Sequence, residues 1–432
     1  MLKSAVFALL ALGAVQIVFA QPAPPKLTLK DAEEMAIKNH PRVLAAQSEV
    51  GYANEQVVET RSAYYPALAA DVTGSAANRG ARVGAGYLSD SRLFNRFGQG
   101  ITLSQLITDV GRTSSLVASS RFNAQASEQN FQATRYDVLL QVNRFYFDVL
   151  HAQSVVRVAE ETVAARQLLF DQVNSLAKNN LRSQLDVSFA DVNVSEAKLL
   201  LLRAQDSVQE GYAELSRALG SDQVINYQLV DEPLPSSPPA KADELISQAM
   251  SNRPELAGLR YSREAAYKFA EAEKDLARPT VSLVGVAGYI PYIAQLTSQP
   301  IPSEYAGAAV NVQIPVFNGH LFSARREAAR YRALEADQNL RNQQERIARD
   351  VRVAWASTLT AFQRIDVTAQ FLRQASLALE LAQGRYNLGL SSIIELTQAQ
   401  LNLTQAEIEN LSAKYDYQGQ YSALQYSIGL LR

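Results

Sequence analysis

The stretch DVSFADVNVSEAKLLL, residues 186–201, carries small apolar side chains at alternating steps of three and four residues. A similar stretch, ELTQAQLNLTQAEIEN, occupies residues 395–410, which is 209 residues later (395 − 186 = 209). This spacing is typical of a coiled-coil seam, and alanine in a seam lets two helices approach closely. Each stretch therefore predicts a long helix packed against an antiparallel partner. The seam residues are Val187, Ala190, Val194, Ala197 and Leu201, matched by Leu396, Ala399, Leu403 and Ala406.

Proline is absent around both stretches, from residue 67 to 232 and from 316 to 432. These regions are rich in Ala, Leu, Gln, Glu and Arg, which are good helix formers. A helix from Val110 to about Ala177 would be about 100 Å long at about 1.5 Å per residue. That length exceeds any ordinary globular core. We expect hairpin turns near 179–183 and 388–392.

The positions of the prolines that separate predicted elements also repeat, which indicates a duplicated unit. Asn39-His40-Pro41 matches Asn252-Arg253-Pro254, and Pro66 matches Pro279, in both cases at a separation of 213 residues (254 − 41 = 213). Each unit is predicted to hold a short helix, a longer helix, a strand pair and two very long helices. We expect a first repeat at 21–230, a linker at 231–241 with the extended sequence DEPLPSSPPAK, and a second repeat at 242–432.

The N-terminal segment 1–20 has the pattern of a secretory signal peptide. Lys3 is followed by the apolar stretch Ala5–Phe19, and small residues at 18 and 20 suit cleavage before Gln21. A membrane anchor is the alternative, but about 15 apolar residues fall short of the roughly 20 that span a bilayer as a helix. We expect the rest of the chain to leave the cytoplasm.

Composition excludes several functions. Lys and Arg total 41 against 43 Asp and Glu, so no net charge favours nucleic acid. With no cysteine, disulfides, thiolate metal sites and a lipid-anchoring cysteine are excluded. The three histidines, His40, His151 and His320, lack the spacing of a metal site. No nucleotide loop or nucleophile motif suggests an enzyme, and no cofactor is expected.

The sequence pattern of the predicted strands favours a protein that crosses a membrane. The first strand of each pair is predicted at Ala67–Ala77 and Thr280–Tyr289, and long polar or proline-broken loops follow at 78–96 and 290–304. The second strands alternate apolar and polar residues, as lipid-facing and lumen-facing side chains do in a transmembrane barrel. The apolar set is Ile101, Leu103, Val310 and Val312, and the polar set is Thr102, Ser104, Asn311 and Gln313.

Four strands cannot close a barrel, because open edges in lipid leave backbone groups unpaired. We therefore expect three chains to contribute twelve strands. A soluble four-stranded sheet on a helical bundle is the alternative, since half-buried sheets also alternate. A periplasmic adaptor or coiled-coil scaffold is a second alternative, but it would present one hairpin and a compact β-rich domain.

Several local sequences resemble the TolC family of outer-membrane efflux proteins, and the resemblance spans nearly the whole chain after the signal segment. LTLKDAEEMAIKNHPRV, at 27–43, is similar to the family's N-terminal helix with its Asn-x-Pro turn. GRYNLGLSSIIELTQAQLNL, at 384–403, is similar to the periplasmic hairpin of the second repeat. The segments 109–112 (DVGR) and 317–319 (FNG) are similar to its strand-to-helix junctions.

The resemblance implies a mainly α-helical protein with a small β part. It implies a homotrimer whose twelve-stranded β-barrel crosses the outer membrane in contact with lipid, and whose α-helical tunnel ends at a closed periplasmic tip. The function implied is the outer-membrane channel of a tripartite efflux or type I secretion system. An inner-membrane pump of the RND or ABC type would deliver substrates through a periplasmic adaptor, or membrane fusion, protein. The cargo stays open between drugs, metal ions and polypeptides.

In the family, aperture residues lie near the hairpin turns, where carboxylates form rings and a tyrosine and an arginine tie neighbouring coils. Asp186 and Glu395 occupy the acidic positions here and Tyr386 the tyrosine position. Ser391 stands where some relatives have the arginine, and Gln398 where a second acidic residue lies. We therefore expect a weaker clasp, or one with other partners, and a ring one carboxylate deep. From the residues alone, both carboxylates also suit the first turn of a helix, where the dipole favours them.

Overall fold

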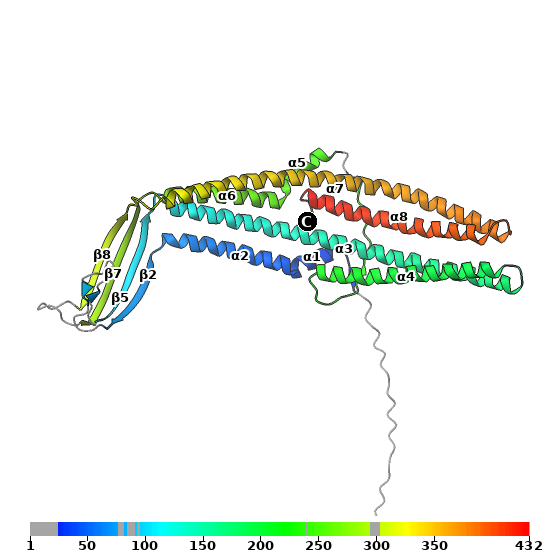
Figure 1. The fold of residues 1–432 in the computed structure, drawn as a ribbon, viewed down its shortest axis with the longest axis horizontal. Helices are drawn as coiled ribbons and strands as arrows, with labels where there is room; N and C mark the ends of the chain where they lie inside the picture. The colour runs from blue at the N-terminus through cyan, green and yellow to red at the C-terminus, as the bar shows by residue number, and fades with distance from the viewer. Residues whose placement is uncertain are drawn as a thin grey trace, which may run out of the picture.

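A computed structural model describes residues 25–76, 82–83, 91–92, 96–238, 241–293 and 303–431. The predicted signal segment and most of both predicted loops lie outside these residues. The chain forms a long helical arm with a sheet at one end and two helical hairpin turns at the other (Figure 1).

The order of elements repeats once along the chain, as the spacing of the prolines predicted. The first series is α1 (Leu29–Asn39), α2 (Pro41–Arg61), β2 (Ala67–Ser75), β5 (Arg96–Thr108), α3 (Arg112–Lys178) and α4 (Gln184–Ala218). The second series is α5 (Ala242–Asn252), α6 (Pro254–Asp275), β7 (Thr280–Ile293), β8 (Glu304–Gln313), α7 (Leu321–Asn387) and α8 (Ile393–Ser427). Short elements complete the described part: β1 (Lys26–Leu27), η1 (Ser62–Tyr64), β3 (Arg82–Val83), β4 (Ser91–Arg92) and β6 (Gln228–Leu229).

The long helices have equal lengths in the two series. α3 and α7 each hold 67 residues, and α4 and α8 each hold 35. The first long helix begins at Arg112 rather than at the predicted Val110, because Val110 and Gly111 have φ angles of 57° and 106°, outside the helical region. The hairpin turns lie where they were predicted. Asn180 and Gly389, at equivalent positions, adopt positive φ there.

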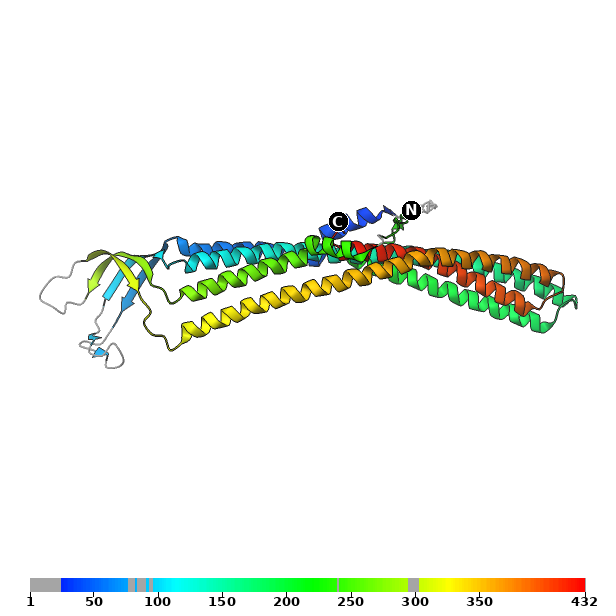
Figure 2. The ribbon, with the colours of Figure 1, turned by 90° about the horizontal axis from the view of Figure 1, so that it is seen from above.

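The predicted seams are buried between antiparallel helices. Val187, Ala190, Val194 and Ala197 of α4 are buried, as are Leu396, Ala399 and Ala406 of α8, and the residues at 201 and 403 are half-buried. α4 packs along α3, and α8 packs along α7. α3 also packs against α8, so that the two hairpins lie side by side along the arm (Figure 2).

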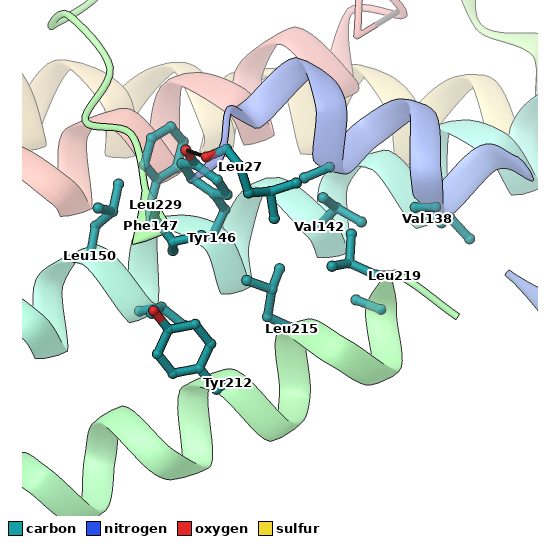
Figure 3. Packing of buried hydrophobic residues seen from close by; sticks show 14 of the residues in the cluster. Leu27, Val138, Val142, Tyr146, Phe147, Leu150, Tyr212, Leu215, Leu219 and Leu229 are labelled. Atoms are coloured by element: carbon teal, nitrogen blue, oxygen red, sulfur yellow. Dashed lines mark hydrogen bonds between the residues drawn. The ribbon is translucent and has the colours of Figure 1, made fainter. Parts of the chain in front are cut away.

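The largest apolar cluster lies midway along the arm, where α1, α3 and α4 meet (Figure 3). Tyr146 of α3 is fully buried in it. Its hydroxyl oxygen lies 2.9 Å from the carbonyl oxygen of Leu27 and 2.7 Å from that of Val230, and it accepts the Val230 N–H at 3.0 Å. Burial raises the pKa of Tyr146 to about 12. These contacts tie the parallel pair β1 and β6 to the long helix.

The sheet is antiparallel throughout, in the order β2-β5-β7-β8. Its register gathers the two alternating sets on opposite faces. Leu68, Leu103, Leu283 and Val310 share one face, whereas Thr102, Ser104, Ser282 and Asn311 share the other. Among the described residues, no helix has the length and apolar character needed to cross a membrane.

Two equivalent glycines close the corners where the short helices meet the ends of the long hairpins. A β-carbon on Gly220 would lie 2.7 Å from the backbone of Asn39, and one on Gly429 would lie 2.9 Å from that of Asn252. Both glycines also have a φ of 74°. The Asn-x-Pro corners found in the sequence therefore pack directly against glycine backbone, which explains why each repeat carries both features.

We expect Gly220→Ala to destabilise the protein by about 2 kcal/mol or more, because it adds left-handed strain to a backbone clash. The measurement is the midpoint of thermal loss of helical circular dichroism in detergent. Gly51→Ala is the control, since Gly51 lies within α2 with nothing within 4 Å of its added β-carbon. That change should be neutral or stabilising by up to about 1 kcal/mol. Equal midpoints for the two variants would contradict the packing argument.

Candidate functional site

The two hairpin turns bring the predicted site residues to the end of the arm that is remote from the sheet. α4 begins with a capping box. The Ser183 hydroxyl oxygen accepts the Asp186 N–H at 3.1 Å, and the Asp186 carboxylate accepts the Ser183 N–H at 3.2 Å. Asp186 thus satisfies backbone groups at the helix start, as its alternative interpretation predicted.

Glu395 holds the equivalent position on α8 but makes a different contact. Ser392 caps this helix through a hydrogen bond from the Glu395 N–H, at 3.4 Å. The Glu395 carboxylate instead pairs with Arg385 of α7, with Oε1 3.0 Å from Nε. The Arg385 side chain is 56% exposed and the Glu395 side chain 45% exposed. The ion pair therefore contributes about 1 kcal/mol or less to stability. It holds the carboxylate of Glu395 beside a positive charge.

Tyr386 lies between the two hairpins. Only 4% of it is exposed, and it packs in an apolar cluster built from α3, α4, α7 and α8. Arg182, from the first turn, lies over its ring with Cζ 4.2 Å from the ring centre and donates a hydrogen bond to the Tyr386 carbonyl oxygen at 3.0 Å. Burial raises the pKa of Tyr386, the Arg182 charge opposes this, and the Asp186 charge adds to it.

The other two predicted residues make fewer contacts. The Ser391 hydroxyl oxygen is buried in the second turn and has no hydrogen-bond partner among the described residues. Gln398 is exposed on α8 and donates to Asn402, one turn later, at 3.0 Å. Within the described part of the chain, no group of three His, Cys, Asp or Glu side chains could hold a metal ion.

Sequence reasoning missed both arginines of the tips. Arg182 is the counterpart of Ser391 at the 209-residue separation of the repeats, so an arginine stands at the equivalent position of the other turn. Aligning the repeats at the turns could have found it. Arg385 stands next to Tyr386 in the sequence. Its ion pair with Glu395, however, depends on how α7 and α8 pack against each other. The tips therefore join Arg182 to Tyr386 between hairpins and Arg385 to Glu395 within one hairpin.

A duplicated helical arm that carries an open sheet with one apolar face is the architecture of an outer-membrane export duct. The model of the family described as "Outer membrane efflux protein" matches residues 33–221 and 245–430. The chain belongs to this family. It is an outer-membrane efflux channel, with its helical arm in the periplasm. The family consists of channels and not of enzymes, and its members act in tripartite systems with adaptors and inner-membrane pumps.

Relatives match over most of their length at low identity. Outer membrane efflux protein BepC of Brucella suis is 23% identical over 394 residues, which cover 90% of this chain and 82% of the relative. Outer membrane protein TolC of Vibrio cholerae is 24% identical over 413 residues, covering 93% and 91%. The crystal structure of the Campylobacter jejuni CmeC outer membrane channel has a TM-score of 0.80 at 18% identity, covering 93% and 85%. These findings confirm the predicted family, the helical fold with a small β part, and the outer-membrane location.

We expect Arg182→Ala to loosen the two hairpins from each other at the tips, because it removes a cation–π contact of about 0.5 to 2 kcal/mol and a hydrogen bond. Because the chain has no cysteine, spin labels at Lys178→Cys and Asn387→Cys would be unique. Their distance distribution should broaden in Arg182→Ala. Arg385→Ala is the control, since its partner Glu395 lies in the same hairpin. Broadening of equal size in both variants would show that Arg182 has no special role.

Proposed function

We propose that three copies of the chain close one channel, and the observation that carries this proposal is the open sheet. β2 and β8 are its outer strands, and each pairs with one other strand within the described residues. Because neighbouring strands alternate in direction, β8 of one copy can pair with β2 of the next in the same antiparallel manner. Each unpaired backbone group in lipid costs several kcal/mol. Twelve strands from three copies would remove both edges.

The two faces of the sheet suit lipid on one side and water on the other. On the face with Leu68, Leu103 and Val310, the large apolar side chains are exposed or half-buried in the single chain, with Leu68 69% and Val310 66% exposed. The opposite face carries hydroxyl, amide and carboxylate groups together with Val284 and Val286. This alternation supports a barrel whose apolar face meets outer-membrane lipid and whose polar face lines the lumen.

The helices leave a second apolar stripe without a partner. Leu185, Val192 and Leu199 follow at seven-residue steps on α4, on the side opposite to its buried seam, and are 64%, 55% and 53% exposed. A neighbouring copy would cover this stripe on α4, as one helix of a coiled coil covers the seam of another. The exposed stripe on α4 therefore supports a homotrimer whose helices form a tunnel.

The boundaries along the chain are part of the proposal. Residues 1–20 would be removed as a signal peptide on export. Residues 21–230 and 242–432 would form the two repeats, and 231–241 the linker between them. The described part of the linker, 231–238, contains no helix or strand, which suits an extended connection.

We further propose that the tips form the gate and the docking surface. The contacts at Tyr386 and Glu395 would keep the tip closed at rest, with Asp186, Ser391 and Gln398 around the same aperture. A periplasmic adaptor would dock at the turns 176–184 and 385–393, and an inner-membrane pump of the RND or ABC type would deliver the cargo. The channel would then be a passive duct for efflux or type I secretion. Family membership supports these partners.

The barrel proposal predicts opposite outcomes for two neighbouring substitutions on β8. Val310→Lys puts a charge on the lipid face and should cost about 2–4 kcal/mol per chain near the middle of the bilayer. Asn311→Lys puts the same charge on the lumen face and should be tolerated. Membrane-inserted trimer, measured by light scattering of detergent extracts, should fall sharply for the first variant alone. Equal amounts of trimer for both variants, or a stable inserted monomer, would contradict the barrel.

The gate proposal predicts that Glu395→Gln weakens block of the channel by multivalent cations by about tenfold, since one lost charged contact is worth about 1.5 kcal/mol. Arg385→Ala should strengthen the block, because it frees the carboxylate from its partner. Single-channel recordings at constant salt, with the cation added on the tip side, measure both effects.

Glu244→Gln, on the exposed first turn of α5, removes the same charge far from the tips and serves as the control. Identical block in wild type and Glu395→Gln would contradict the role of Glu395 in the gate. Glu395 would then be only a carboxylate in the first turn of α8.

A further inference from the structure

One row of residues crosses all four strands of the sheet. Asp71 on β2 is opposite Gly100 on β5, Gly100 is opposite Gly288 on β7, and Gly288 is opposite Tyr305 on β8. The row therefore has a carboxylate at one end, an aromatic ring at the other and bare backbone between them. It belongs to the polar face, because Thr102 and Ser104 follow on the same side of β5.

The hydroxyl end of Tyr305 lies over the two glycines. A β-carbon added to Gly100 would lie 2.3 Å from the Tyr305 hydroxyl oxygen, and one added to Gly288 would lie 2.4 Å from it. Tyr305 thus reaches from β8 across β7 to β5, toward the strand that carries Asp71. Tyr305 is 42% exposed, so part of its side chain stays open on the polar face.

A cavity of about 290 Å³ lies at this row. Asp71, Thr73, Gly98 and Tyr305 are among the residues that line it. The Asp71 carboxylate accepts one hydrogen bond, from the Thr102 hydroxyl at 3.3 Å, and has no ion-pair partner within the described residues. Among the described residues, the cavity therefore combines a carboxylate that has no ion-pair partner with a partly exposed tyrosine.

We propose that this row is a subsite for organic cations, such as protonated or quaternary amines, on the wall of the channel. A carboxylate attracts the positive charge, and the face of a tyrosine ring binds a cation whose apolar substituents shed water easily. The two glycines leave room for the Tyr305 side chain to lie against the sheet, on the cavity that Asp71 also lines. The subsite lies within one chain, and it rests on the proposed function in one respect, namely that the polar face lines the lumen.

The test is block of single channels in a planar bilayer by benzyltrimethylammonium added on the barrel side. Tyr305→Leu should weaken the block about two- to fivefold, as expected for loss of an exposed cation–π contact. Tyr305→Phe keeps the ring face and should retain the block within about twofold. Asp71→Asn should weaken it at least as much as Tyr305→Leu, whereas block by Mg²⁺ should depend on Asp71 and not on Tyr305.

Glu304→Gln is the matched control. Glu304 precedes Tyr305 and lies opposite Tyr289, on the other face of the sheet. The substitution therefore removes one charge per chain at the same level of the sheet. It should leave the block unchanged. A loss of block equal to that of Asp71→Asn would mean that general surface charge is responsible, and the subsite would be wrong.

The outcomes separate the subsite from the channel itself. Wild-type protein that forms no conducting trimer would overturn the proposed function and the subsite with it. Conducting wild type whose block is unchanged in both Asp71→Asn and Tyr305→Leu would overturn the subsite alone. Conductance without blocker, recorded for every variant, checks that each channel is intact.

Discussion

Close packing of small side chains between antiparallel helices is the interaction on which the rest of the molecule depends. The arm is long and thin, and outside the central cluster around Tyr146 its long helices bury narrow stripes of side chains. Ala190 and Ala197 on α4, and Ala399 and Ala406 on α8, let the helix backbones approach and keep those stripes continuous. Larger residues there would push the helices apart. The position of the sheet and of both turns follows from this packing, because α3 and α7 connect them without interruption.

The repeated pattern made much of this predictable. Seam spacing, proline positions and the 209-residue separation led to the right elements in the right order, because they reflect local periodicity and backbone chemistry. The contacts at the tips were out of reach. Arg182 meets Tyr386 only because the two hairpins lie side by side, and no local pattern encodes that. The row from Asp71 to Tyr305 likewise depends on three strand registers, which together connect two residues 234 positions apart (305 − 71 = 234).

The two repeats share a backbone but use it differently. Asp186 and Glu395 stand at the same position of equivalent helices, behind equivalent serine caps. The shorter aspartate turns back to the backbone of its own helix start. The longer glutamate reaches Arg385 on the neighbouring helix. One methylene group thus separates a side chain that only ends a turn from one that is placed to carry charge at the tip.

The uninterrupted course of α3 has a mechanical consequence. This helix contains neither glycine nor proline over its 67 residues, so it lacks the usual sites at which helices kink. A rod about 100 Å long that pivots by one degree at the sheet moves its far end by nearly 2 Å. Small changes of tilt near the membrane would therefore become side-chain-sized displacements at Arg182 and Tyr386. With such an arm, a tilt of a few degrees at one end would be enough to make or break contacts at the other end.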